Sequence, residues 1–356
     1  MNSKILLRDN LQDTGTTTTS MSYSSPDIIT HSQVADSKTF FTNNYGKDPN
    51  EALGTQNDNY IYVRVKNIGN EAVPKTYVNL YVNQLSLYLN PLNWGKNRIS
   101  TIRGNNYSTI DSLACNEIGV TNDYFLFNRS KYGNSCFVAV AGSEQNPDFT
   151  WINSWAKYVE WVTTNANVAA RNMVTYKEGE SIDYNSHMNL CNPYETDATF
   201  LLIVEANSLV PEGTTFGIES KAFNIDYEKK CSGTDRKFSI SVTLQPKADN
   251  YVNVYGKLKN KSASWPAGAS LTVQSILVQF GMDAVCDNAV VQSINKDGIF
   301  RNAKYVLTPT ECVHIYNSNP SVRIQAVPEN NSLKAAAGPV FGLIIGECGV
   351  QYIKEV

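Results

Sequence analysis

Hydrophobic and polar residues alternate along residues 59–83, and this alternation predicts two β-strands. Apolar residues occupy the odd positions of residues 61–65 and the even positions of residues 78–82. A period of two is expected where one face of a sheet is buried and the other is wetted. Asn67 and Gly69 mark the connection because both residue types tolerate positive φ. The face expected to meet solvent carries Tyr60, Tyr62, Arg64 and Lys66.

Beyond residue 83 the apolar residues shift from even to odd positions. Leu85, Leu87 and Leu89 place the apolar face on odd positions, and a one-residue slip inverts the buried face of a strand. This change predicts a bulge or turn near Asn83 and Gln84. Residues 136–141 and 199–206 are apolar on both faces, which predicts central strands that are covered on both sides.

The rest of the chain consists of short apolar runs separated by Asn, Gly, Pro and Ser clusters. Turn signals recur about every ten residues, as in sandwiches and barrels. One short turn of helix within residues 154–162 is the only helix expected. We therefore predict an all-β fold of two β-sandwich domains, residues 25–207 and 208–356. Residues 8–25 are polar and low in complexity, so we expect residues 1–24 to form a flexible N-terminal arm or an element that orders on assembly.

Several segments in order resemble the cell-adhesion-related domain found in bacteria (CARDB). They are SPDII at 25–29, the strand pair through residue 83, Pro91 and Trp94, SCFVAVAG at 135–142 and NANVAARNMVTY at 165–176. The stretch 95–134 is longer than that family's pattern, and the resemblance ends near residue 207. It implies an immunoglobulin-like sandwich that serves adhesion, spacing or assembly outside a cell or on a particle, without a catalytic centre.

Composition narrows the class of partner. The chain has 356 residues, enough for two domains. With 18% charged residues, 20 Tyr and a net charge of -3, it carries no electrostatic footprint for nucleic acid or an anionic membrane. No apolar run approaches the roughly 20 residues of a membrane helix. The triplet at residues 5–7 is too short for a signal-peptide core.

Candidate chemistry is sparse. The seven cysteines are widely spaced, which favours free thiols over a disulfide framework. Cys312 with His314, and His187 with Cys191, lack the ligand spacing of a zinc site. Cys136 follows a turn but enters an apolar strand, where a thiol is normally inert. The acidic residues between 27 and 58 lack a calcium-loop pattern. No motif of nucleophilic catalysis or phosphate binding occurs, and we expect no cofactor.

The densest aromatic cluster is the candidate binding or interface site: Trp151, Trp155, Tyr158 and Trp161. If these side chains are exposed, they could stack on sugar rings or anchor a protein interface. If they are buried, they close the end of a sandwich, and this is the preferred interpretation.

The leading functional hypothesis is a non-enzymatic structural or assembly protein that self-associates, with its N-terminal arm adding a strand to a neighbour's sheet. One alternative is a secreted or toxin-associated adhesin or lectin-like module with a glycan or cell-surface ligand. Another is an enzyme of unrecognised type in the C-terminal half. An extracellular or particle-associated location is expected, although cytoplasmic accumulation is compatible with the sequence.

Overall fold

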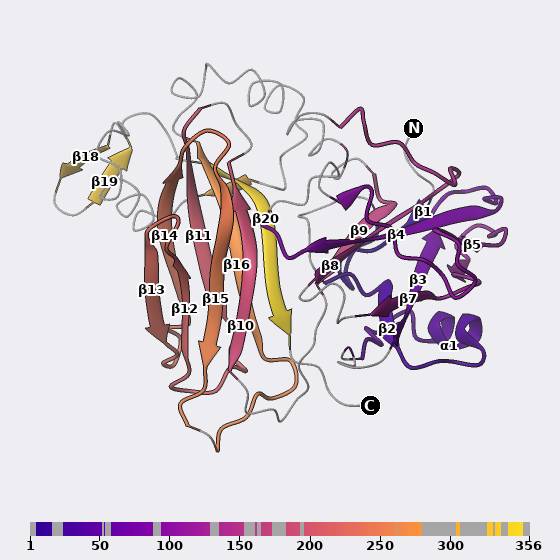
Figure 1. Cartoon of the computed structure of the whole chain (residues 1–356), viewed down its shortest axis with the longest axis horizontal. Helices are drawn as coiled ribbons and strands as arrows, with labels where there is room; N and C mark the ends of the chain where they lie inside the picture. Colours follow the sequence, from indigo (N-terminus) through magenta and orange to yellow (C-terminus); the bar gives the residue numbers. More distant parts are fainter. Residues whose placement is uncertain are drawn as a thin grey trace.

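The chain folds into two β-sandwiches, which confirms the predicted all-β class (Figure 1). The computed structural model describes residues 5–15, 24–51, 53, 58–87, 94–128, 135–152, 161, 165–172, 183–192, 196–260, 262–279, 304–306, 326–329, 332–335 and 341–351. All strand pairs in these ranges are antiparallel. The first sandwich contains the N-terminal strands, and the second contains most strands after residue 183.

The first sandwich is built around the long strand β3 (Asp58–Asn67). Strands β1 (Ile5–Leu6) and β2 (Ile28–His31) lie end to end along one edge of β3, and β6 (Ile118–Val120) and β7 (Phe125–Asn128) lie along the other. The facing sheet has the order β5 (Ser108–Ile110), β4 (Thr76–Gln84), β8 (Ser135–Gly142), β9 (Val168–Asn172). Apolar side chains from both sheets fill the space between them, among them Val63, Leu80 and Phe137.

The second face of β3 is covered, which corrects the expectation of a wetted face. Helix α1 (Ser37–Asn43) was not predicted, and its Phe41 ring lies 4.8 Å from the Tyr62 ring. Tyr62 is 1% exposed and Arg64 is fully buried. Asp36 caps the helix by accepting a hydrogen bond from the Thr39 N–H at 3.1 Å. Seven residues that include Thr and Phe have little helix propensity of their own, so packing on β3 stabilises this helix.

Strand β4 serves two cores, and this explains the change of apolar parity without a bulge. Its even positions 78, 80 and 82 point into the first sandwich, whereas Tyr81 belongs to a second cluster together with Leu85 and Leu87, which follow the end of the strand at Gln84. The β4–β8 pairing runs from residue 77 to residue 84 without a register shift. The apolar residues shift from even to odd positions because the even side chains pack in the first core and the odd side chains pack in the second cluster.

Strand β8 is the central strand that the apolar run 136–141 predicted. It lies between β4 and β9, and its residues 135–141 are all buried. Strand β11 (Ala198–Ala206) likewise lies between two neighbours, and only Glu205 along it is exposed.

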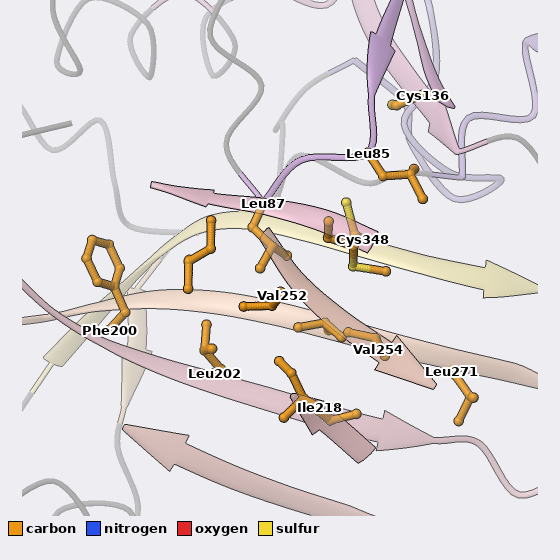
Figure 2. Close-up of a cluster of buried hydrophobic side chains, with 14 of the residues drawn as sticks. Leu85, Leu87, Cys136, Phe200, Leu202, Ile218, Val252, Val254, Leu271 and Cys348 are labelled. Atoms are coloured by element: carbon orange, nitrogen blue, oxygen red, sulfur yellow. The ribbon is translucent and has the colours of Figure 1, made fainter. Parts of the chain in front are cut away.

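The second sandwich has a four-stranded and a five-stranded sheet. The first has the order β10 (Tyr184–Cys191), β15 (Asp249–Lys257), β12 (Thr215–Ser220), β13 (Ile225–Lys230). The other has the order β14 (Lys237–Leu244), β11, β16 (Ser270–Gln279), β20 (Phe341–Gln351), β17 (Lys304–Val306). A separate hairpin joins β18 (Ala326–Glu329) to β19 (Ser332–Ala335). Phe200, Ile218 and Val252 lie in the core between the two sheets (Figure 2).

Strand pairing groups residues 184–206 with the second sandwich. β10 pairs with β15, and β11 pairs with β14 and β16. The predicted boundary between two sandwich domains at residues 207 and 208 stays a prediction. Strands that precede residue 207 and strands that follow it pair within the same two sheets.

Residues 5–9, expected within the flexible arm, are packed on the first sandwich. Ile5, Leu6 and Leu7 are at most 4% exposed, and Arg8 and Asp9 are also buried. Local composition did not indicate this because the partners of these residues lie far along the chain. Residues 1–4 and 16–23 of the expected arm lie outside the described residues.

Candidate functional site

The structure separates the described members of the predicted aromatic site. Trp151 is 45% exposed, whereas Trp161 is 7% exposed. Trp155 and Tyr158 lie outside the described residues. A binding role for the four residues together stays a prediction.

Trp161 belongs to an aromatic cluster that covers the outer face of the β4–β8 sheet. Its ring lies 5.4 Å from Phe149 and 6.2 Å from Trp94. The Trp94 ring lies 5.0 Å from Tyr81, which projects from β4. These tilted and edge-to-face arrangements are the favoured geometries of aromatic pairs in cores. Trp161 therefore contributes to packing between the two sandwiches.

The chain passes directly from β4 into the second sandwich, and this joint is the best-defined contact between the two. Leu87 N–H donates to the Asn189 carbonyl and Asn189 N–H to the Leu85 carbonyl, both at 2.9 Å. The segment thereby extends the sheet along the free side of β10 through a parallel bridge. Cys348 of β20 donates its thiol hydrogen to the Ser86 carbonyl at 3.0 Å.

Side chains reinforce this joint. Leu85, Leu87 and Cys348 lie in one apolar cluster with the core of the second sandwich (Figure 2). The Tyr251 hydroxyl donates to Gln84 Oε1 at 2.7 Å. Asn172 Nδ2 in β9 donates to the Gly349 carbonyl at 3.2 Å. Backbone pairing and packing together fix one sandwich against the other.

A buried charged cluster fastens the N-terminal segment to the first sandwich. Arg8 donates from Nε and Nη2 to the two carboxylate oxygens of Asp27 at 2.9 and 2.7 Å. Arg64 Nε donates to the same carboxylate at 2.8 Å. The Tyr45 ring lies 3.5 Å from the Arg8 guanidinium carbon. No local sequence pattern indicates this cluster, because Arg8, Asp27 and Arg64 meet only through long-range pairing.

Burial shifts the pKa values of two ionisable side chains in this region, Arg64 and Asp9. Desolvation lowers the pKa of Arg64, and the charge and hydrogen bond of Asp27 offset this only in part. Desolvation, together with the nearby charge of Asp13, raises the pKa of Asp9 well above its usual value. The buried carboxyl group of Asp9 thus directly follows Arg8, which pairs with Asp27.

The acidic residues weighed for calcium do not form one site. Asp27 pairs with two arginines, Asp36 caps α1 and Asp48 pairs with Arg171 at 2.9 Å. No group of three or more His, Cys, Asp or Glu side chains suited to a metal ion occurs in the part of the chain that the structure describes.

The candidate thiols and imidazoles are likewise apart. His187 and Cys191 lie on β10, whereas Cys312 and His314 lie outside the described residues. The five described cysteines are free thiols, and burial raises the pKa of Cys136 well above its usual value. A buried thiol with a raised pKa has little thiolate, so Cys136 is a packing residue.

The outer face of the four-stranded sheet of the second sandwich is the broad polar surface that sequence reasoning missed. Tyr251 is 45% exposed on it, and the Tyr255 ring lies across Gly217. The Tyr255 hydroxyl donates to Glu228 at 3.1 Å. Burial, followed by the hydrogen bond and charge of Glu228, raises the pKa of Tyr255 to about 12. The tyrosines alternate with apolar residues along 251–255, which was the available signal.

Comparison with known proteins gives no family. No protein-family model matches the chain, and no curated protein matches it significantly. The CARDB resemblance is therefore not confirmed. No helix among the described residues is both long and apolar enough to cross a membrane.

Solved structures give distant likenesses only. Red sea bream transglutaminase aligns at 11% identity over 64% of this chain and 28% of its own, with a TM-score of 0.19. The collagen adhesin (CNA) from S. aureus aligns at 10% identity over 64% and 83%, with a TM-score of 0.17. A bacterial adhesin from Mobiluncus mulieris aligns at 7% identity over 86% and 96%, with a TM-score of 0.18. At these TM-scores the likenesses carry no argument about function.

Proposed function

We propose that the chain is a non-enzymatic structural or assembly protein that acts through β-sandwich contacts and associates with copies of itself. The observation that carries this proposal is the joint between the sandwiches. Leu85 and Leu87 continue β4 into the second core, and backbone hydrogen bonds to Asn189 extend the adjoining sheet. A spacer or subunit needs its outer surfaces held in a fixed relation, and this joint supplies that.

The proposal includes a CARDB-like role for the first sandwich and a location outside the cell or on a particle. In support, four buried charged side chains of the first sandwich have ion-pair partners: Asp27 pairs with Arg8 and Arg64, and Arg171 pairs with Asp48. These residues stabilise the scaffold, which leaves the sheet faces and edges for contact with partners.

Native mass tests the proposal. Multi-angle light scattering of the purified chain across a range of concentrations should give a mass above that of the 39.5 kDa monomer. A monomer at every concentration, in a protein with intact β-sheet circular dichroism, would refute self-association.

An adhesin or lectin-like module is the second candidate, and Trp151 favours it. This side chain is 45% exposed, and an exposed indole can stack on a sugar ring. A glycan array should then give a signal that Trp151→Ala removes. Trp161→Phe is the matched control, because Trp161 is buried and should not touch a ligand at the surface. A blank array with folded protein would refute this candidate.

A further inference from the structure

The N-terminal segment, residues 5–9, is docked as a strand in a site built entirely from other parts of the first sandwich. Ile5 and Leu6 stand opposite Asn67 and Lys66 of β3. The next residue, Leu7, donates its N–H to the Ala166 carbonyl at 2.7 Å, just before β9. The segment therefore bridges the edges of both sheets.

We call the receiving surface the slot; it consists of Ser25, Asp27, Tyr45, Lys66 and Ala166 with their neighbours. The Ser25 hydroxyl donates to the Arg8 carbonyl at 2.6 Å, and Asp27 accepts from the Arg8 guanidinium and from its N–H. Arg64 also holds the Asp27 carboxylate. Of these contacts, only the Arg64–Asp27 bond is independent of the segment, and it holds the Asp27 carboxylate in place for whichever segment binds.

Arg64 keeps the slot in shape through its remaining donors. Nη1 donates to the carbonyls of Phe41 and Asn44, and Nη2 to those of Pro26 and Lys47, at 2.9 to 3.3 Å. A preorganised acceptor lowers the ordering cost of whatever segment binds there.

We infer that residues 5–9 of one copy of this chain can occupy the slot of a second copy, so that neighbouring molecules exchange their N-terminal strands. This inference rests on the proposed self-association and names the contact that makes it. The contacts between segment and slot do not depend on the segment's covalent connection, so exchange preserves all of them. Strand exchange is a low-cost route to association for this reason.

The length of the connection after residue 15 and the charge of Arg8 favour a second copy of this chain as the molecule whose segment enters the slot. Eight residues, TTTTSMSY, separate Gly15 from Ser24, and an extended chain of that length spans roughly 30 Å. That reach is about the diameter of a small domain. The slot selects three apolar residues followed by a guanidinium, because a segment without the cation would leave Asp27 with Arg64 alone. The chain itself carries that sequence at residues 5–8.

Engineered cysteines at the Leu6–Lys66 pair test the inference. Directly opposed residues in an antiparallel pair bring their Cβ atoms to about 5 Å, a separation that small local shifts can bridge with a disulfide. In a Cys115→Ser background, the double variant Leu6→Cys/Lys66→Cys should close on oxidation with oxidised glutathione, which establishes that the geometry permits the bond. Its non-reducing gel and peptide map then identify the linked positions.

The decisive sample is a co-expressed pair of single variants: a tagged Leu6→Cys chain with an untagged Lys66→Cys chain. Neither chain can close on itself at this pair, so a disulfide from position 6 of the tagged chain to position 66 of the untagged chain forms only through exchange. We expect this heterodimer on a non-reducing gel, with the linkage confirmed by mass spectrometry. Each single variant expressed alone should lack that linkage.

A closed double variant without heterodimer from the co-expressed singles would overturn the exchange. If light scattering still shows an oligomer, only the exchange fails and the proposed function survives. If the chain is a monomer, both fail. A heterodimer whose disulfide does not join positions 6 and 66 would also overturn the inference.

Discussion

Replacing Asp27 with asparagine should destabilise the first sandwich by about 3 to 5 kcal/mol, the usual cost of breaking a buried ion pair on one side. The Asp27 carboxylate accepts four hydrogen bonds of 2.7 to 3.0 Å, three from Arg8 and one from Arg64. The side chains of Asp27 and Arg64 are 0% exposed and that of Arg8 is 4% exposed. An asparagine would turn amide hydrogens toward guanidinium donors and leave two cations without a counter-charge away from water.

Two further variants separate charge from hydrogen bonding. Arg8→Met should cost less, about 1 to 3 kcal/mol, because Asp27 keeps its bond to Arg64 and one charge of each sign remains. Arg64→Met should cost as much as Asp27→Asn, since four backbone carbonyls lose their donor along with the charge. The expected order of stability is therefore wild type, then Arg8→Met, then the other two.

Urea unfolding followed by circular dichroism gives the free energies, and amide hydrogen exchange in β3 shows where protection is lost. An Asp27→Asn variant within about 1 kcal/mol of wild type, with β3 still protected, would refute the reasoning. That result would mean that water or rearrangement compensates the two arginines.

Three other variants test pH dependence and packing. Burial alone would raise the pKa of Asp48, but the charge and hydrogen bond of Arg171 lower it. The pair therefore stabilises the fold above pH 3.8, and its contribution is lost as the pH falls through the lowered value. The difference in urea midpoint between Arg171→Met and wild type should narrow in acid without vanishing, because Arg171 Nη1 also donates to the Ser25 carbonyl; a difference that does not change with pH would contradict the ion-pair assignment. The pKa of Asp9 is raised, so its contribution to stability is greatest below pH 3.8 and is lost as the pH rises. Asp9→Asn should therefore raise the urea midpoint at neutral pH and leave it unchanged in acid. An unchanged neutral midpoint would contradict the assignment. Gly217→Ala places a Cβ 2.5 Å from the Tyr255 ring and 2.6 Å from the Tyr227 carbonyl oxygen, and it should cost about 1 to 3 kcal/mol by thermal unfolding. A Tyr255→Ala background removes only the first of these contacts, so Gly217→Ala should cost less there without becoming neutral. Equal costs in the two backgrounds would contradict a contribution from the Tyr255 ring.

The local pattern of apolar and polar residues predicted strands whose burial follows a period of two or whose two faces are both covered. Phe238, Ile240, Val242 and Leu244 alternate with Ser and Thr in the sequence, and all four are buried in β14. The apolar runs of β8 and β11 predicted central strands, and both have neighbours on each side. These predictions are confirmed because sheet burial repeats with a period of two.

The contacts across the fold could not be read from local pattern. Arg64 has the spacing of a wetted position, yet its partner Asp27 lies 37 residues away, and its Nη1 donates to the Phe41 carbonyl in helix α1. The N-terminal segment reads as polar low complexity from residue 8 onward, although Arg8 is buried by its ion pair. Of the aromatic site, Trp161 has its partners at Trp94 and Phe149, 67 and 12 positions distant along the chain.

The two apolar faces of β4 determine how the molecule responds to load. Tension applied across the two sandwiches passes from Leu85 and Leu87, which follow the end of β4, into the strand that holds Leu80 in the first core. A pull that opens one sandwich must therefore shear the β4–β8 ladder rather than extend a linker. Under such a load we expect the β4–β8 ladder and the hydrogen bonds to Asn189 to break in the same event.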